Sequence, residues 1–416
     1  MWVGGVTNPA AMDLTSSYIR AVKSLDQIDF AVLVNNIILD AVHDKASDIH
    51  IEPWESTIPI RLRISGLLRE LTHLPHEFLD RIAGRLKVMA DLVTYETELP
   101  QEGRVPASAE FGNVELRVSI FPTVRGEKIV IRLFDPQNRS FNLETLGFEA
   151  DTIERFKKLI QQPSGLILLN GPTGSGKTTA IYSALCHLVE IHGPTISIST
   201  VEDPVEFNLP MISQSQISNS RGFTYPMALR SLMRQDPEAI MIGEIRDPET
   251  AAIAVQAGLT GHMIFSTIHS DSTAGVFARL INMDIEPFLL ASSITGVLGL
   301  RLLRTICPRC KTETQPSPEH LSLLPDGYAE ETVFYTGSGC AACFQTGYHG
   351  RVAATELLNS NESIREGVIQ KLRTSKLHDT AIDQGMTTLW QNAMAKVQRG
   401  ITSLEEVIRV ISVNQL

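Results

Sequence analysis

Long hydrophobic runs are absent from this sequence of 416 residues. A membrane-spanning helix needs roughly 20 apolar residues. The longest apolar stretch, from Phe288 to Leu300, is shorter and leads into Arg301. The N-terminal segment MWVGGVTNPA lacks the basic start and apolar core of a secretory signal. These absences predict a cytoplasmic protein without a spanning segment.

An excess of positive charge is absent as well. The chain has 36 basic and 47 acidic residues, which give a net charge of -11 at pH 7. Aromatic residues make up only 6% of the chain and do not cluster with basic ones. Non-specific contact with nucleic acid depends on such features. We therefore expect no direct binding to nucleic acid, although a local basic patch is compatible with this composition.

Cysteine is scarce, and its spacing is informative. Four of the five cysteines form two C-x-x-C pairs, Cys307/Cys310 and Cys340/Cys343. Two such pairs supply four thiolates for a tetrahedral zinc ion, and a four-cysteine shell leaves no open position for catalysis. Disulfides or reduced thiols are the alternatives, and a cytoplasmic location disfavours disulfides. We predict a structural zinc site, and we interpret Cys186 as a small buried residue.

The length of the chain predicts two or three domains. Residues 1–28 are weakly patterned and are interpreted as a lead-in. A helix is predicted from the N-cap candidate Asp29, and another near 76–93. The segments IRLRI and VELRVSI alternate apolar and polar residues, as half-buried strands do. The pattern predicts a small α+β domain over 29–136, followed by a linker over 137–145.

Near-continuous apolar segments replace this alternation in the rest of the chain. They cover 165–170, 195–200, 239–243 and 263–269, with helical stretches between them. Parallel strands that are buried on both faces have this composition. We predict an α/β domain with a parallel sheet over 146–416, which includes the cysteine element at 305–352 and helices at the C-terminus.

A glycine-rich loop follows the first of these strands and opens a helix. In that context such a loop cradles phosphates with its backbone N–H groups, aided by the helix N-terminus. Lys177 would reach the terminal phosphates, and Thr178 would bind Mg²⁺. A glycine-rich turn without a ligand is the plainer interpretation, and the flanking strand and helix argue against it. The candidate nucleotide-binding residues are Gly171, Pro172, Thr173, Gly174, Ser175, Gly176, Lys177, Thr178 and Thr179.

Acidic residues end two further strands. In IMIGEIRD, Gly243 stands where a magnesium-binding Asp is usual, so Glu244 is the candidate for polarising the attacking water. In STVEDPVEF, Glu202 is the candidate for a catalytic or metal-associated role, with Asp203 and Glu206 beside it. Such carboxylates are often structural or merely solvated. Their position at the carboxyl ends of parallel strands favours the functional interpretation.

Two histidines flank the strand at 263–269. His262 precedes its apolar part, and His269 ends it. A histidine at a strand end is more often structural, but one of these two could donate to the γ-phosphate and respond to its loss. His269 is our candidate, and the choice between the two stays open.

In their order along the chain, these motifs resemble those of the secretion ATPase superfamily, in its type II secretion and type IV pilus assembly branch. GPTGSGKTT is similar to its Walker A motif, STVEDPVEF to its acidic box, IMIGEIRD to its Walker B motif and AGLTGHMIFSTIHSD to its histidine box. ASDIHIEP, LPQEGR and RVSIFPTVRGEKIVIRL are similar to its first domain. LRTICPRCK and GCAACFQTGYHGR are similar to its paired-cysteine element, which the retraction ATPases lack. The resemblance runs from about Asp29 to the C-terminus.

The resemblance implies a RecA-like P-loop domain that carries a tetracysteine zinc subdomain and follows a small, PAS-like α+β domain. It implies a homohexameric ATPase that uses ATP, Mg²⁺ and Zn²⁺ as cofactors. Its partners would be an inner-membrane platform protein and other secretion or pilus assembly components, through which it would lie peripheral to the inner membrane. Arg104 and Arg117 match arginines that close a neighbouring subunit's nucleotide site, or else they are solvated strand charges. Arg230 and Arg234 would be further sensors.

The chain departs from the family pattern at several places. Ser65 stands where an Asp is usual, Glu98 stands near a usual basic residue, and GLRLLR replaces AQRLVR. We expect no counterpart, in the residues before Asp29, to the N-terminal domain that docks such ATPases on a membrane partner. The resemblance therefore defines the motor better than its attachment.

Three functions compete at this point. The leading hypothesis is an ATP-hydrolysing motor that drives pilin-like subunits into a filament. The second is a motor for conjugation or DNA uptake, which the negative net charge disfavours. The third is a non-catalytic nucleotide-binding scaffold, which the intact Lys177, Thr178 and Glu244 disfavour.

Overall fold

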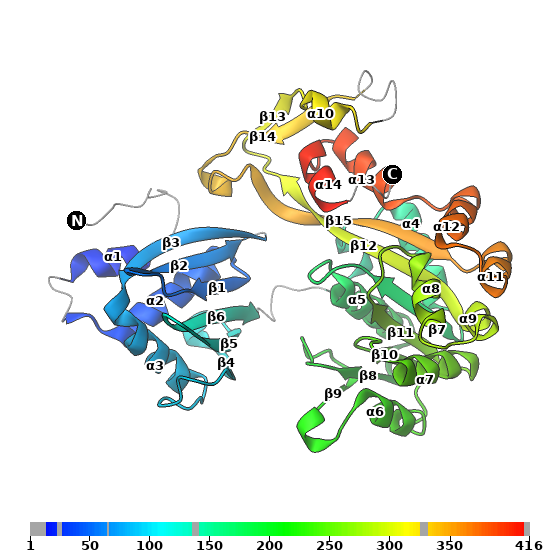
Figure 1. The fold of residues 1–416 in the computed structure, drawn as a ribbon, viewed down its shortest axis with the longest axis horizontal. Helices are drawn as coiled ribbons and strands as arrows, with labels where there is room; N and C mark the ends of the chain where they lie inside the picture. Colours follow the sequence, from blue (N-terminus) through cyan, green and yellow to red (C-terminus); the bar gives the residue numbers. More distant parts are fainter. Residues whose placement is uncertain (1–13, 23–26, 65, 135–140, 325–331, 412–416) are drawn as a thin grey trace. The chain divides into compact units, whose positions relative to one another are not determined.

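The computed structural model describes residues 14–22, 27–64, 66–134, 141–324 and 332–411 (Figure 1). Some residues named in the sequence analysis lie outside these ranges. They are Ser65, residues 137–140 of the expected linker, and residues 1–13 and 23–26 of the expected lead-in. The chain divides into two compact units. The first comprises residues 1–139 with 339–348, and the second comprises residues 140–338 with 349–416.

A six-stranded sheet forms the centre of the first unit. Its strands follow the order β3-β2-β1-β6-β5-β4, and every neighbouring pair is antiparallel. The strands are β1 (Asp48–Ile51), β2 (Thr57–Ile64), β3 (Leu67–Pro75), β4 (Gln101–Ser108), β5 (Val114–Thr123) and β6 (Gly126–Phe134). They are accompanied by helices α1 (Leu14–Ala21), α2 (Phe30–His43) and α3 (Leu79–Met89).

The alternation in the sequence sorts the strand side chains onto two faces. Ile60 and Leu62 of β2 and Leu116 of β5 are buried in the core of the first unit. Arg61 of β2 and Arg117 of β5 alternate with these residues and are only partly buried. A period of two along a strand produces this division between a buried and a solvated face.

Both N-terminal helices are attached to this core. Asp29 caps α2, where its carboxylate accepts the N–H of Ala31 at 2.8 Å, in agreement with the sequence. Helix α1 falls in the segment that we interpreted as a lead-in. The buried carboxylate of Asp40, on α2, accepts the N–H groups of Leu14 and Thr15, each at 2.9 Å. The apolar pattern of this segment is too weak to predict a helix, but the side chain of Asp40 caps the N-terminus of one there.

A seven-stranded sheet with the order β15-β12-β7-β11-β10-β8-β9 forms the centre of the second unit. The pairs from β12 through to β9 are all parallel, which confirms the predicted parallel sheet. The strands are β7 (Gly165–Asn170), β8 (Ile198–Glu202), β9 (Ser213–Gln216), β10 (Ala239–Ile242), β11 (Met263–Ile268), β12 (Ile294–Ile306) and β15 (Tyr348–Asn359).

Both faces of this sheet are buried, as the near-continuous apolar strands require. On β7, Leu166 and Leu168 belong to one core, together with residues of α7, α9, α11 and α12. Ile167 and Leu169 belong to a second core, together with residues of α4 and α5. The helices are α4 (Ala150–Ile160), α5 (Lys177–His192), α6 (Tyr225–Leu232), α7 (Pro248–Leu259), α8 (Gly275–Ile281), α9 (Pro287–Ser293), α11 (Glu362–Ile369) and α12 (Thr374–Asp383).

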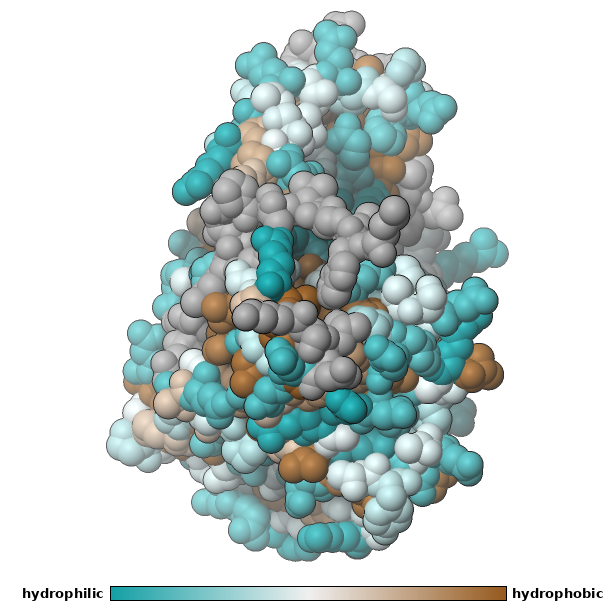
Figure 2. Space-filling view, turned by 90° about the vertical axis from the view of Figure 1, so that its left-hand side faces the viewer, coloured by the Kyte–Doolittle hydropathy of each residue, from teal (hydrophilic) through white to brown (hydrophobic). Residues whose placement is uncertain are grey.

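A smaller two-stranded sheet and further helices complete the second unit. β13 (Lys311–Thr314) pairs antiparallel with β14 (Phe334–Gly337). The helices are α10 (Pro318–Leu321), α13 (Leu389–Gln398) and α14 (Leu404–Val410), and residues of the last two share a core with Leu303 of β12. Across the described ranges, no helix combines the length and apolar character needed to cross a membrane. Hydrophilic residues predominate on the face of the molecule shown in Figure 2.

Candidate functional site

The glycine-rich loop joins β7 to α5 at the carboxyl edge of the parallel sheet. A Cβ at Gly171 would lie 2.5 Å from the carbonyl oxygen of Leu300 and 2.6 Å from Oγ of Ser175, so space requires glycine there. Gly174 has a φ of +77° and no atom within 4 Å of an added Cβ, so backbone conformation alone requires glycine. Together these glycines let the loop take the tight course of a phosphate-binding loop.

One buried polar atom of the loop points to a ligand. Ser175 is 4% exposed, and its Oγ has no hydrogen-bond partner among the described residues. A buried hydroxyl without a partner is costly, and a phosphate oxygen would accept its hydrogen. Thr178 and Thr179 lie partly buried in the first turn of α5, where the helix N-terminus favours an anion. These residues therefore fit a nucleotide phosphate, and the hydroxyl of Thr178 fits a Mg²⁺ ligand.

Lys177 folds back over the loop. Its Nζ donates to the carbonyl oxygens of Gly171 at 2.7 Å and Pro172 at 3.0 Å. Burial lowers the pKa of Lys177, the charge of Glu244 raises it, and the charge of Arg301 lowers it again. The ammonium group is thus held inside the loop, within electrostatic range of the candidate water-activating carboxylate. A phosphate at this position would meet a partly buried positive charge.

Glu244 follows the end of β10, at the same edge of the sheet. Its carboxylate forms an ion pair with Arg246. A Cβ at the preceding Gly243 would lie 2.6 Å from the hydroxyl of Tyr225, so an acidic side chain at that position would require Tyr225 to shift. The space around Gly243 thus favours the glycine that departs from the usual pattern. Glu244 is the carboxylate that this strand end offers for water activation.

Glu202, at the end of β8, is 2% exposed, and its carboxylate is well occupied. It accepts hydrogen bonds from the hydroxyl of Tyr182, from the hydroxyl of Thr200 at 2.5 Å and from Nε2 of Gln214 at 3.1 Å. Burial and the charge of Glu202 raise the pKa of Tyr182. Asp203, the next residue, is exposed. This geometry suits a positioning carboxylate better than a proton acceptor, and the catalytic role of Glu202 stays a prediction.

The two candidate histidines lie at opposite edges of the sheet. His269 follows β11 directly and is exposed at the edge that carries the glycine-rich loop. His262 precedes β11, and its Nδ1 lies 3.2 Å from the carbonyl oxygen of Ala257 and 3.4 Å from the hydroxyl of Thr260. Local backbone and side-chain contacts thus account for His262. Its position therefore leaves His269 as the candidate for responding to the nucleotide.

Arg104 and Arg117 stand directly opposite one another on β4 and β5 of the first unit. Arg104 has a 66% exposed side chain and forms an ion pair with Glu115, and Nε of Arg117 lies 3.7 Å from the same carboxylate. The guanidinium of Arg117 also stacks on Phe134, 4.3 Å from the ring centroid. Like charges directly opposite each other are unfavourable, and the carboxylate of Glu115 contacts both arginines. A role of the two arginines toward a neighbouring subunit stays a prediction.

Arg230 and Arg234, the further sensor candidates, lie in and just after α6. Arg230 forms an ion pair with Glu249 of α7 at 2.5 Å. The NH1 group of Arg234 donates to the carbonyl oxygen of Arg230 at 2.7 Å. These contacts give both residues a local role, and their function as sensors stays a prediction.

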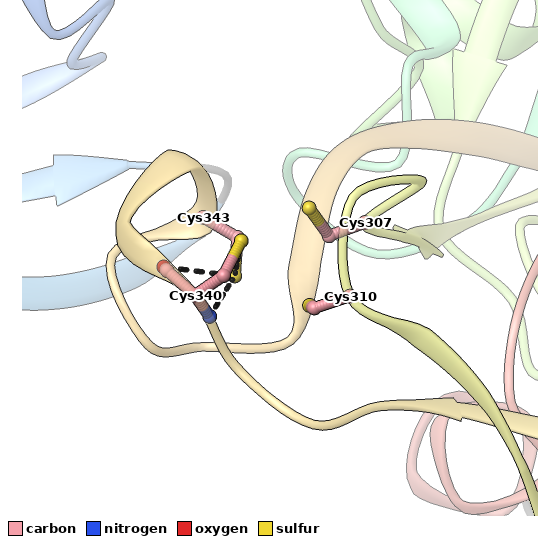
Figure 3. Close-up of side chains that lie close together, drawn as sticks. All are labelled: Cys307, Cys310, Cys340 and Cys343. Carbon is pink, nitrogen blue, oxygen red and sulfur yellow. Dashed lines mark hydrogen bonds between the residues drawn. The ribbon is translucent and has the colours of Figure 1, made fainter.

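The two cysteine pairs come together in one cluster (Figure 3). The four Sγ atoms all lie within 4.8 Å of one another, and those of Cys340 and Cys343 are 3.7 Å apart. Tetrahedral zinc with Zn–S bonds of about 2.3 Å places its sulfurs about 3.8 Å apart. Sγ of Cys343 also accepts the N–H groups of Cys340 at 3.2 Å and Gly347 at 3.3 Å, which favours a thiolate. The cluster is therefore compatible with zinc in both spacing and chemistry.

A further polar group near the loop was missed in the sequence. Glu356 of β15 is buried, and it accepts hydrogen bonds from the hydroxyl of Thr273 and, at 3.2 Å, from the N–H of Leu389. Nε2 of His378 lies 3.4 Å from the same carboxylate. Arg301 of β12 is close enough for its charge to interact with that of Glu356. No motif in a single sequence marks these residues, because they come from separate elements.

Sequence comparisons agree with this site. Residues 24–409 match the family model described as "Type II/IV secretion system protein". The chain is 42% identical over 391 residues to the type IV pilus assembly ATPase PilB of Myxococcus xanthus, covering 93% of this chain and 68% of that protein. It is 40% identical over 388 residues to the type II secretion system ATPase E of Vibrio cholerae, covering 93% of this chain and 76% of that protein.

Solved structures share the fold. The X-ray structure of the ATPase DotB of Legionella pneumophila matches with a TM-score of 0.69 and 20% identity, covering 92% of this chain and 96% of that one. The crystal structure of the pilus retraction motor PilT with bound ADP matches with a TM-score of 0.61 and 23% identity, covering 90% of this chain and 96% of that one. At these identities the likeness concerns the mixed α/β fold alone.

Proposed function

Since the chain belongs to the family of type II/IV secretion system proteins and is an ATPase, we propose that it is a hexameric motor that assembles a filament of pilin or pseudopilin subunits. It would act through a platform protein of the inner membrane and other secretion or pilus assembly components. It would then lie on the cytoplasmic side, held at the membrane by these partners.

One observation carries the proposal: chemically distinct groups meet at one edge of the parallel sheet. The glycine-rich loop follows β7, and Glu202, Glu244 and His269 stand at the ends of β8, β10 and β11. The buried hydroxyl of Ser175 has no protein partner, which matches a phosphate oxygen in its place. The groups that would bind phosphate, activate water and sense the nucleotide therefore stand at the same edge of the sheet.

The residues divide the work of hydrolysis between them. The backbone of the loop, Ser175 and Lys177 would hold and neutralise the phosphates, and Thr178 would hold the Mg²⁺ that further neutralises them. Glu244 would orient the attacking water and accept its proton on a carboxylate oxygen. Glu202, held by Tyr182 and its other donors, would support the strand end beside it. His269 would donate to the terminal phosphate and register its loss.

We assign the cysteine cluster a structural zinc ion. Four thiolates complete a tetrahedral shell, so no position remains for a reacting water. The ion would hold together segments that are separated along the chain, because Cys307 and Cys310 follow β12 and Cys340 and Cys343 precede β15. Its contribution would be to folding rather than to ATP chemistry.

Closure of the nucleotide site by a neighbouring subunit would couple ATP hydrolysis to movement of the ring. Arg104 and Arg117 lie on the first unit, whose antiparallel sheet with flanking helices we compare with PAS domains. In a ring they would reach the RecA-like domain of the next subunit and neutralise charge that develops on the phosphates. The 66% exposed side chain of Arg104 supports this role.

Two substitutions test the activity directly. Lys177→Ala should abolish ATP hydrolysis, whereas Lys158→Ala, at an exposed position of α4, should leave it intact. Glu244→Gln should retain ATP binding but hydrolyse at least ~10²-fold more slowly, the low end of what a positioned proton acceptor contributes. Steady-state phosphate release and nucleotide titration would measure both. Wild-type turnover in Lys177→Ala would refute the site, and wild-type turnover in Glu244→Gln would assign water activation to another group, with Glu202 the next to be substituted.

A further inference from the structure

Arg301 lies beside the glycine-rich loop although it belongs to another strand. β12 pairs in parallel with β7, and Gly299 stands opposite Asn170, the residue before the loop. The carbonyl oxygen of Leu300 lies so near Gly171 that a Cβ there would be 2.5 Å from it. The next residue, Arg301, therefore starts from the edge of the sheet where the phosphates would bind.

The guanidinium of Arg301 has few hydrogen-bond partners among the described residues. It is partly buried, and within the described ranges it makes a single hydrogen bond, from NH1 to the carbonyl oxygen of Leu300 at 2.9 Å. It forms no ion pair with any described carboxylate. Burial lowers the pKa of Arg301, which shows that its charge is poorly solvated. A guanidinium has five N–H donors, so most of them are available to a ligand.

The charges around Arg301 favour an anion at its side. Lys177 is near enough that the charge of Arg301 lowers its pKa. Both cations are partly buried, and among the described residues the ammonium group of Lys177 donates only to carbonyl oxygens of the loop. Glu244, the carboxylate in range of Lys177, is paired with Arg246. Two poorly neutralised cations side by side repel each other unless an anion lies between them.

The carboxylate behind Arg301 does not supply that anion. The charge of Glu356 raises the pKa of Arg301, which shows that the two groups interact. Glu356 is nevertheless occupied by the hydroxyl of Thr273, the N–H of Leu389 and the imidazole of His378. Its carboxylate oxygens are engaged by those three partners, and it forms no ion pair with Arg301.

We propose that Arg301 is a phosphate-binding residue of the nucleotide site in its own chain. Its guanidinium donates to the terminal phosphate oxygens, next to Lys177. Charge-assisted hydrogen bonds of this kind are the stronger ones in proteins. This inference rests on the proposed ATPase site, and it adds a cationic ligand that does not depend on a neighbouring subunit. It also places Glu356 and His378 directly behind a nucleotide contact.

The proposal is tested by calorimetric titration of the protein with ADP and, separately, with a non-hydrolysable ATP analogue. Both titrations are made in the presence of Mg²⁺. Arg301→Gln should weaken binding of the ATP analogue by roughly tenfold to a hundredfold, as expected when a hydrogen bond to a charged group is lost. Binding of ADP should weaken less, because ADP carries less negative charge. Arg301→Lys should show an intermediate loss, since it keeps the charge without the planar fork. Arg365→Gln, at an exposed position of α11, should bind like the wild type.

The melting temperatures of all variants show whether a loss of affinity is due to unfolding. If Arg301→Gln is unfolded at the assay temperature, Arg301→Lys decides, and wild-type affinity for the ATP analogue in that variant would overturn the proposal. Equal affinities in Arg301→Gln and the wild type would overturn it too, as would equal losses for ADP and the ATP analogue. Lys177→Ala distinguishes this failure from a failure of the proposed function. If Lys177→Ala loses binding while Arg301→Gln keeps it, the ATPase site stands and only the role of Arg301 falls.

Discussion

A mixture of two inactive variants can show whether Arg117 serves a neighbouring subunit. A chain with Arg117→Ala keeps an intact glycine-rich loop, and a chain with Lys177→Ala keeps intact arginines. If the arginine acts within its own chain, no mixture of the two can hydrolyse ATP. If it acts across a ring interface, some interfaces in a mixed ring pair an intact loop with an intact arginine, and activity returns.

The structure and the geometry of a ring set the expected magnitude. Removal of an arginine of this kind costs roughly 10³–10⁵ in rate, so each variant alone should be nearly inactive. In a head-to-tail ring with random mixing, an equal mixture pairs an intact loop with an intact arginine at about a quarter of the interfaces. The rate should therefore rise to about a quarter of the wild-type rate at equal amounts and fall on either side.

The packing of Arg117 requires a second substitution. Its side chain is 26% exposed and stacks on Phe134, so Arg117→Ala removes packing as well as charge. Arg104 has a 66% exposed side chain, so Arg104→Ala removes mainly charge. Recovery should occur when either arginine variant is mixed with Lys177→Ala. Melting temperatures would show how much of the Arg117→Ala effect is structural.

The assay is ATPase rate against mixing ratio, under conditions in which subunits exchange and native mass spectrometry confirms mixed rings. The matched control mixes Arg117→Ala with a chain that carries both substitutions, because no interface in that mixture has an intact arginine. A flat curve in the test mixture, with mixed rings present, would refute action across an interface. The arginine would then serve its own chain or the fold.

Two further predictions concern the cysteine cluster and the buried carboxylate. Elemental analysis should find close to one zinc per chain. The zinc should be lost in Cys340→Ser, which should keep part of its ATPase activity, and it should be retained in Cys186→Ser. Protein that is purified without chelator and contains no metal, with all four thiols of the cluster reactive, would refute the zinc site. The stabilisation from Glu356 and His378 should be largest between about pH 4.3 and 6.5, their ordinary pKa values. Burial raises the pKa of Glu356, but hydrogen bonds from His378 and Thr273 lower it overall, whereas the bond to Glu356 raises the pKa of His378. Stability should thus fall as pH drops through the lowered pKa of Glu356, and also as pH rises through the raised pKa of His378. The midpoint of urea unfolding, measured against pH, checks this. If the midpoint of His378→Gln declines at high pH as much as that of the wild type, the prediction is wrong.

The parts of the fold that were predicted share one property, which is that the signal is local. Alternation in IRLRI and VELRVSI identifies β2 and β5, because a period of two sorts side chains onto two faces. Continuous apolar runs identify β7, β10 and β11, since both faces of that sheet are covered. The loop GPTGSGKTT identifies the strand before it and the helix after it.

The parts that were missed depend on contacts between distant segments. The apolar stretch from Phe288 to Leu300 divides between α9 and β12, and periodicity cannot separate a short buried helix from a buried strand. No strand was predicted after the cysteine pairs, but residues 348–359 form β15, in which alanine, glutamate and leucine adopt a strand beside β12. Tertiary pairing overrides helix propensity there. β9 has the sequence SQSQ, and a polar edge strand leaves no apolar signal.

The same distinction separates the site residues that were found from those that were missed. Glu202 ends β8, Glu244 follows β10, and Lys177 ends the loop that follows β7. A parallel sheet collects such residues at one edge whatever the order of its strands. Arg301 reaches that edge only because β12 adds to the sheet in parallel, with Gly299 opposite Asn170. A Cβ at Gly299 would also lie 2.9 Å from the side chain of Thr273, which bonds to Glu356. β12 therefore touches the glycine-rich loop on one side and the Glu356 group on the other.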